Sequence, residues 1–135
     1  MSSNPNNQKS KSSENPRFSL KKRFQSFPYA MNGVRLLIQN THNAWVHLFA
    51  AVLAIILGFV LEISRGEWML IIIVIGLVLA LEAVNSALEI LCDFVSPEKH
   101  DQIKKIKDLS AGAVLIAALT SFIVGLMIFL PKIDW

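Results

Sequence analysis

The chain has 135 residues, of which 53% are apolar, and its formal net charge is +3. A soluble domain this small cannot bury so much apolar surface, because a large share of a small domain's surface stays in contact with water. Length and composition therefore exclude a small soluble domain and a multidomain protein, and they indicate a single integral membrane domain. The one cysteine, Cys92, excludes a disulfide within the chain and a CxxC metal site, and we expect it to be a small packed side chain.

The N-terminal part of the chain is polar first and amphipathic afterwards. Residues 1–17 are rich in Ser, Asn and Pro, which predicts a disordered tail. Residues 18–40 carry apolar and basic side chains at helical spacing, so we expect a helix on the membrane surface, in two pieces that separate at Pro28. Ser26 is placed to cap the second piece, because Pro is tolerated in a first turn.

Most of the basic excess of the chain lies in residues 1–35. A basic segment of this kind can bind nucleic acid, but it lacks the interleaved aromatic residues that RNA-binding segments carry. Attraction to an anionic membrane surface explains it more simply, and we expect no nucleic-acid partner.

Three apolar runs are long enough to cross a bilayer as helices, which takes about 20 residues each. They cover approximately residues 44–63, 67–92 and 109–130. Basic residues are plentiful before the first run and in the second loop, but few in the first loop and at the end, which places the N-terminus in the cytoplasm and the C-terminus outside. We therefore expect residues 18–135 to form an all-α membrane domain, with three transmembrane helices and an N-terminal amphipathic surface helix. The third run is rich in small residues, which allow close helix packing within one chain or between chains.

The second apolar run changes character in its inner half, where four polar residues appear: Glu82, Asn85, Glu89 and Asp93. At about 100° per residue, all four lie within an arc of about 80° on one helix face. Because a carboxylate in contact with lipid is costly, this face is expected to point into protein or water. A proton relay, an ion path, a phosphate-handling metal site and a polar seam that fixes helix register are all compatible with these four residues alone.

The second loop ends with Lys107 and Asp108, on the same side of the membrane as the acidic row. Phosphoryl transfer needs carboxylates that hold Mg²⁺, a cation that neutralises phosphate charge and a base that takes a hydroxyl proton. The sequence contains no Walker A motif and no glycine-rich kinase loop, so a nucleotide would have to be held by the helices themselves. A lysine that only sets the topology is the alternative explanation for Lys107.

The pattern ExxNxxxExxxD over residues 82–93, followed by the Lys107–Asp108 pair, closely resembles the small bacterial membrane lipid kinases, which are the prokaryotic diacylglycerol kinases and their undecaprenol kinase relatives. The resemblance covers roughly residues 18–130. It implies a homotrimer in the bacterial inner (cytoplasmic) membrane, with active sites at the cytoplasmic face that are shared between subunits. It also implies Mg²⁺-dependent transfer of the γ-phosphate of ATP to the primary hydroxyl of diacylglycerol or undecaprenol.

The resemblance further implies a role for each matching residue. Glu82 is expected to be the general base, and Asn85 to help place the lipid or its reacting oxygen. Glu89 is expected to bind the metal ion, with Asp93 and Asn43 as supporting residues. The nucleotide is expected to contact Lys22, Tyr29, Glu89, Glu98, Lys99, His100, Lys107 and Asp108.

Thr41 departs from the family pattern. The family usually has a second metal-binding glutamate before the first span, in a pattern like ExNxxxH, and here Thr41 takes that position ahead of Asn43 and His47. A threonine hydroxyl is a much weaker ligand for Mg²⁺, and His42 is a poor substitute because Mg²⁺ prefers oxygen. His47 itself is explained equally well by helix packing. An impaired member of the family and a non-enzymatic channel or assembly subunit therefore remain as alternatives to a working kinase.

Overall fold

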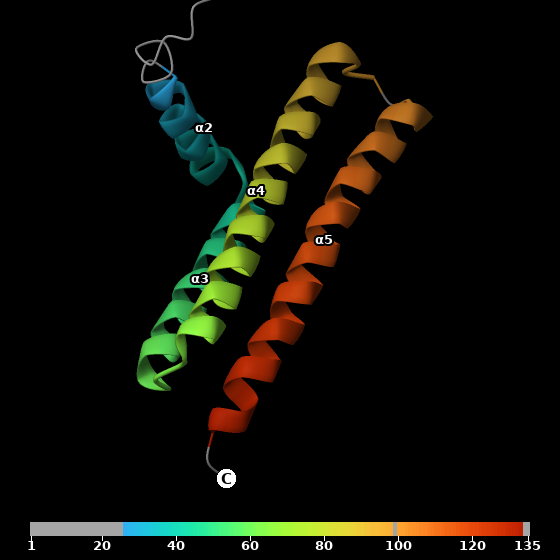
Figure 1. Cartoon of the computed structure of the whole chain (residues 1–135). Helices are drawn as coiled ribbons and strands as arrows, with labels where there is room; N and C mark the ends of the chain where they lie inside the picture. Colours follow the sequence, from blue (N-terminus) through green and yellow to red (C-terminus); the bar gives the residue numbers. More distant parts are fainter. Residues whose placement is uncertain (1–25, 99, 134–135) are drawn as a thin grey trace, which may run out of the picture.

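The computed structural model describes residues 26–98 and 100–133. This part of the chain is helical except for short connections and contains no strand, which confirms the all-α prediction (Figure 1). Its elements, in chain order, are α2 (Phe27–Asn40), α3 (His42–Val60), α4 (Arg65–Val95), α5 (Asp101–Phe129) and the short 3₁₀ helix η1 (Leu130–Lys132). The predicted tail 1–17 and the first piece of the predicted surface helix lie outside the described residues.

Helix α2 is the second piece of the predicted surface helix. Ser26 occupies its N-cap position and a proline lies in its first turn, as the sequence predicts, although the Ser26 side chain makes no capping hydrogen bond to the helix. Its apolar side chains Phe27, Met31 and Val34 are exposed in the single chain. The helix contacts both α3 and α4, and it crosses them at an angle instead of extending α3 (Figure 1). Thr41, in an extended conformation, makes the turn between α2 and α3.

Within the described residues, three helices are long and apolar enough to cross a membrane, namely α3, α4 and α5 with its 3₁₀ extension. This confirms the three predicted transmembrane helices, although the helices differ in length. Helix α3 has 19 residues, whereas α4 has 31 and α5 has 29. At a rise of about 1.5 Å per residue, α3 is about as long as the hydrocarbon core is thick, and the other two are about 45 Å long. Both long helices therefore extend beyond the apolar layer.

The boundaries of two helices differ from those of the apolar runs. The sequence led us to expect a loop before Leu109. Helix α5 instead begins at Asp101, so Lys104, Lys105 and Lys107 lie in its first two turns. Helix α3 ends at Val60, and the chain then turns through Glu62, whose φ is 48°. Ile63 follows this turn and is buried, which explains why apolar residues continue beyond the end of the helix.

The end of the bundle where α3 turns into α4 is closed by specific contacts. Ser64 and Glu67 form a capping box, in which the Ser64 N–H donates to Glu67 Oε2 (2.6 Å) and the Glu67 N–H to Ser64 Oγ (3.4 Å). Glu67 also forms an ion pair with Lys132 of η1, the short helix that follows α5 (3.3 Å). The Trp68 ring packs on Phe59, with 4.9 Å between ring centroids. These contacts fix the register of all three spans at one end.

Helix α4 lies between α3 and α5 and makes most of the contacts that hold the bundle together (Figure 1). Helices α3 and α5 leave a largely apolar groove of about 530 Å³ along α4, which we call the groove above α4. It is lined by Ile71, Val74 and Val78 among others, and His47 lies at the end away from the α3–α4 turn. When residues are counted along both helices from the α3–α4 turn, Glu82 of α4 is approximately level with the first turn of α3. Glu89 and Asp93 therefore lie on the part of α4 that extends past α3.

Candidate functional site

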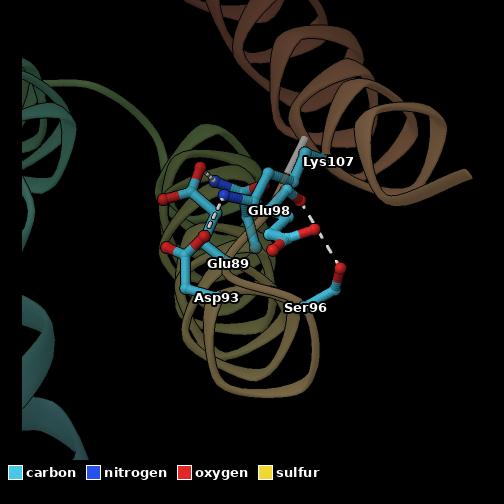
Figure 2. A network of polar contacts seen from close by, with 6 residues as sticks. Glu89, Asp93, Ser96, Glu98 and Lys107 are labelled. Carbon is cyan, nitrogen blue, oxygen red and sulfur yellow. Dashed lines mark hydrogen bonds and ion pairs between the residues drawn. The ribbon is translucent and has the colours of Figure 1, made fainter. Parts of the chain in front are cut away.

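The polar row of α4 makes hydrogen bonds within itself and with α5. The Asn85 side-chain amide donates from Nδ2 to Glu89 Oε1 (3.1 Å), one helical turn further along α4. Across the interface, Ser110 Oγ donates to Asn85 Oδ1 (2.7 Å). Near the end of α4, the Lys107 ammonium group forms an ion pair with Asp93 Oδ1 (2.5 Å), as Figure 2 shows. The structure thus brings together four of the predicted site residues and one serine that was not predicted.

This arrangement follows from the geometry of two adjacent antiparallel helices. Asn85, Glu89 and Asp93 are four residues apart, so they lie above one another on one face of α4. Lys107 and Ser110 are three residues apart and share a face of α5 in the same way. Because α5 runs in the opposite direction, Lys107 meets the end of the row at Asp93 and Ser110 meets Asn85 deeper in the bundle.

Glu82 is the innermost member of the row and the most deeply buried, with only 1% of its surface exposed. Its Oε1 atom has no hydrogen-bond partner among the described residues. Its electrostatic neighbours are His47 of α3 and Glu89, which lies about two helical turns further along α4. A buried carboxylate oxygen without a partner is costly, and proteins retain such groups mostly where function requires them.

Exposure rises steadily along the row. Glu82 and Asn85 are buried, Glu89 is half-buried and Asp93 is exposed. One face of α4 therefore leads from the interior of the bundle to the water beyond it. A group held at the buried end of the row, near Glu82, and a charged, water-soluble molecule at its exposed end, near Asp93, could meet along this face.

Among the described residues, no three His, Cys, Asp or Glu side chains cluster into a metal site. Mg²⁺ does not need such a cluster, because proteins commonly hold it through one or two carboxylates together with phosphate oxygens and water. Glu89 suits this mode of binding, since it is half-buried and its Oε1 accepts a single hydrogen bond from Asn85. Thr41 is engaged elsewhere, because its hydroxyl donates to the carbonyl oxygen of Leu37 (2.5 Å) at the end of α2.

The other predicted nucleotide contacts do not join this network. Tyr29 is exposed on α2, and Asp108 is exposed on α5. In the α4–α5 connection, the Glu98 carbonyl oxygen accepts from Ser96 Oγ (3.4 Å), as Figure 2 shows. His100 is the N-cap residue of α5, where its Nδ1 accepts from the Gln102 N–H (3.2 Å). Lys22 and Lys99 lie outside the described residues, and Asn43 is exposed in the first turn of α3.

Ser110 and Ser86 are the two polar residues of the site that the sequence did not single out. Both are buried, and Ser86 Oγ donates to the backbone oxygen of Glu82 (2.8 Å). Ser110 stands first in a run of small residues, which led us to treat it as a packing residue. Its spacing of three from Lys107 was the available signal, because that spacing places both side chains on one face of a helix.

Comparison with known proteins assigns the chain to a family. Residues 28–129 match the family model described as prokaryotic diacylglycerol kinase. An undecaprenol kinase from Bacillus subtilis is 39% identical over 121 residues, which are 90% of this chain and 98% of that protein. A diacylglycerol kinase from Synechocystis is 34% identical over 109 residues, which are 80% of this chain and 62% of that protein. These matches confirm the resemblance seen in the sequence: the chain belongs to the prokaryotic diacylglycerol kinase family.

Proposed function

We propose that this protein is a lipid kinase, which uses ATP and Mg²⁺ to phosphorylate the primary hydroxyl of a membrane lipid alcohol. The observation that carries the proposal is the buried Glu82 carboxylate, whose Oε1 has no partner among the described residues, at the inner end of a polar row that leads to Lys107. Kinase names among the relatives support it. The row connects an apolar interior, suited to a lipid, with the aqueous side, where ATP is present.

Each member of the row has a distinct part in the proposed reaction. Glu82 accepts the proton of the lipid hydroxyl while the hydroxyl oxygen forms a bond to the γ-phosphorus and the bond to ADP breaks. Glu89 holds the metal ion, which when bound neutralises charge on the phosphate oxygens. Lys107 turns from Asp93 towards the phosphates, because a compact ammonium group on a flexible stem can exchange one anion for another. Asn85 helps to place the reacting oxygen.

The nucleotide is proposed to bind at the end of the bundle where α4 and α5 extend past α3. Tyr29, Glu98, His100 and Asp108 are proposed as contacts there, together with Lys22 and Lys99. This end is proposed to face the cytoplasm of a bacterial cell, with the C-terminus on the outer side of the inner membrane. The basic residues before the first span and at the start of α5 support this orientation.

Residues 18–135 are proposed as the kinase domain, with 1–17 as a disordered tail, and the active unit as a homotrimer that shares its sites between subunits. Large apolar side chains are exposed on every span of the single chain, and they must face lipid or another protein surface. The groove above α4 is largely apolar and ends at His47, which interacts with Glu82. An acyl or polyprenyl chain would therefore find an apolar surface beside the proposed base.

Of the two lipids that the relatives' names offer, we propose undecaprenol first. The undecaprenol kinase from Bacillus subtilis aligns over 98% of its length, whereas the diacylglycerol kinase from Synechocystis aligns over 62%. Nearly the whole length of that relative therefore has a counterpart in this chain.

The test is a substrate panel in one set of mixed micelles. The purified full chain is incubated with Mg-ATP and either undecaprenol or diacylglycerol, and the lipid products are identified by mass spectrometry. A phosphorylated lipid with undecaprenol at the higher rate is the expected result. A higher rate with diacylglycerol would overturn only the choice of lipid. No phosphorylated product from either lipid, with a protein that is helical by circular dichroism, would overturn the kinase assignment.

A further inference from the structure

Ser110 is a buried hydroxyl, 9% exposed, at the interface of α4 and α5. Its Oγ lies 2.7 Å from Asn85 Oδ1 and 3.0 Å from the backbone oxygen of Lys107 in the preceding turn of its own helix. A hydroxyl has one proton and can donate it to only one of these two acceptors at a time. The contact with Asn85 is the shorter and the only one of the two that joins the helices.

Two hydrogen bonds connect Glu89, Asn85 and Ser110, and the chemical groups at the two ends determine which atom donates in each. An ionised carboxylate only accepts hydrogen bonds, so Asn85 must turn its NH₂ group towards Glu89. The amide oxygen of Asn85 then faces α5, where it needs a donor because Asn85 is buried. Ser110 supplies that donor. The amide is therefore held at both ends, and its flipped orientation would place an oxygen against a carboxylate.

We propose that Ser110 is a positioning residue of the kinase site: through Asn85, its hydroxyl holds the Glu89 carboxylate in the orientation that binds the metal ion. The proposal rests on the proposed function, because it takes Glu89 as the metal ligand. Groups that orient a metal ligand from behind commonly change metal affinity by about 10- to 100-fold when they are removed. Loss of the Ser110 hydroxyl is expected to act in this range, without any contact between Ser110 and the metal.

A pure packing role for Ser110 makes the opposite prediction. Small residues at a helix interface allow close approach, so a packing position tolerates alanine and resists the larger threonine. A hydrogen-bonding position resists alanine, which has no donor, and is rescued by threonine, which keeps the hydroxyl. The pair of variants Ser110→Ala and Ser110→Thr therefore separates the two roles.

The experiment measures metal affinity without turnover. The full chain, labelled with ¹⁵N, is titrated in micelles with Mn²⁺ in the presence of ATP and without lipid, and the broadening of the Asn85 side-chain NH₂ signals is followed. We expect Ser110→Ala to shift these signals and to raise the Mn²⁺ concentration for half-maximal broadening by about 10-fold or more. Ser110→Thr should restore both. Ser86→Ala is the matched control, because it removes an equally buried hydroxyl that bonds only to backbone.

Three results would overturn the proposal: no broadening in the wild-type protein, wild-type affinity in Ser110→Ala, or a threonine variant as impaired as the alanine variant. Failure of the proposed function is recognised separately. A protein that binds Mn²⁺ in the predicted way but phosphorylates no lipid would contradict the kinase assignment and leave the positioning of Glu89 by Ser110 supported.

Discussion

Gly58 of α3 leaves room for the Trp68 ring of α4, and we predict that Gly58→Ala destabilises the protein. A Cβ atom added at Gly58 would lie 2.8 Å from Trp68 Cη2, 2.9 Å from Trp68 Cζ2 and 3.1 Å from Ile63 Cδ1. The indole cannot simply move aside, because it packs on Phe59 at the same end of the bundle.

The expected size of the effect follows from these distances. Carbon atoms in contact normally lie about 3.5–4.0 Å apart, so the indole must move by about 1 Å. Such overpacking costs about 1–3 kcal/mol, and alanine returns up to about 1 kcal/mol through its better helix propensity. Gly66, in the first turn of α4, has no atom within 4 Å of an added Cβ. Gly66→Ala therefore gains helix propensity without a packing cost. We therefore expect Gly58→Ala to be less stable than Gly66→Ala by about 1–3 kcal/mol.

The assay is reversible unfolding in mixed micelles with a rising fraction of sodium dodecyl sulfate, followed by circular dichroism. Trp68→Phe removes the two ring atoms closest to the added methyl group, so Gly58→Ala should cost much less in that background. Equal stability of Gly58→Ala and Gly66→Ala would refute the reasoning. So would an unchanged cost of Gly58→Ala when Trp68 is replaced, because the clash would then not involve the indole.

Three further predictions concern the cap, the metal and the ion pair. Ser64→Ala removes the capping-box hydroxyl of α4 and should lower the free energy of unfolding by about 1 kcal/mol in the same assay, with recovery in Ser64→Asp. Thr41→Glu should lower the Mg²⁺ concentration needed for half-maximal activity, and an unchanged requirement would show that residue 41 does not face the metal. Lys107→Met should raise the KM for ATP by about 10-fold or more while stability barely changes, because its pair with Asp93 is largely exposed. Denaturation of Lys107→Met under native conditions would show a structural role instead.

The polar row of α4 could be read from the sequence because it depends only on helical periodicity. Four residues spaced by three or four must share a face, whatever surrounds the helix. Lys107 was placed correctly near the row for a similar reason, since a short connection forces α5 to run back beside α4. The burial of Glu82 next to His47 required the structure, because it depends on where α3 begins relative to α4.

Other features depend on contacts that no pattern along one helix reveals. Hydropathy marks where a chain enters the apolar layer and not where a helix begins, so the first two turns of α5 were missed. Their charged residues are compatible with a helix in water, and Asp101 in the first turn suits the helix dipole. Ser110 was taken for a packing residue because a serine looks the same in sequence whether it packs or donates a hydrogen bond. Only its partner, Asn85, distinguishes the two.

The central claim is that the buried end of the polar row carries out phosphoryl transfer. The most direct measurement compares transfer of ³²P from γ-labelled ATP to undecaprenol by the wild-type chain and by Glu82→Gln, in identical micelles. Removing a general base lowers rates by about 10²–10⁴-fold, and we predict a loss in this range for Glu82→Gln. The variant should unfold no more easily than the wild type, because it removes a buried carboxylate whose Oε1 has no partner among the described residues. Transfer by Glu82→Gln at the wild-type rate would contradict the claim.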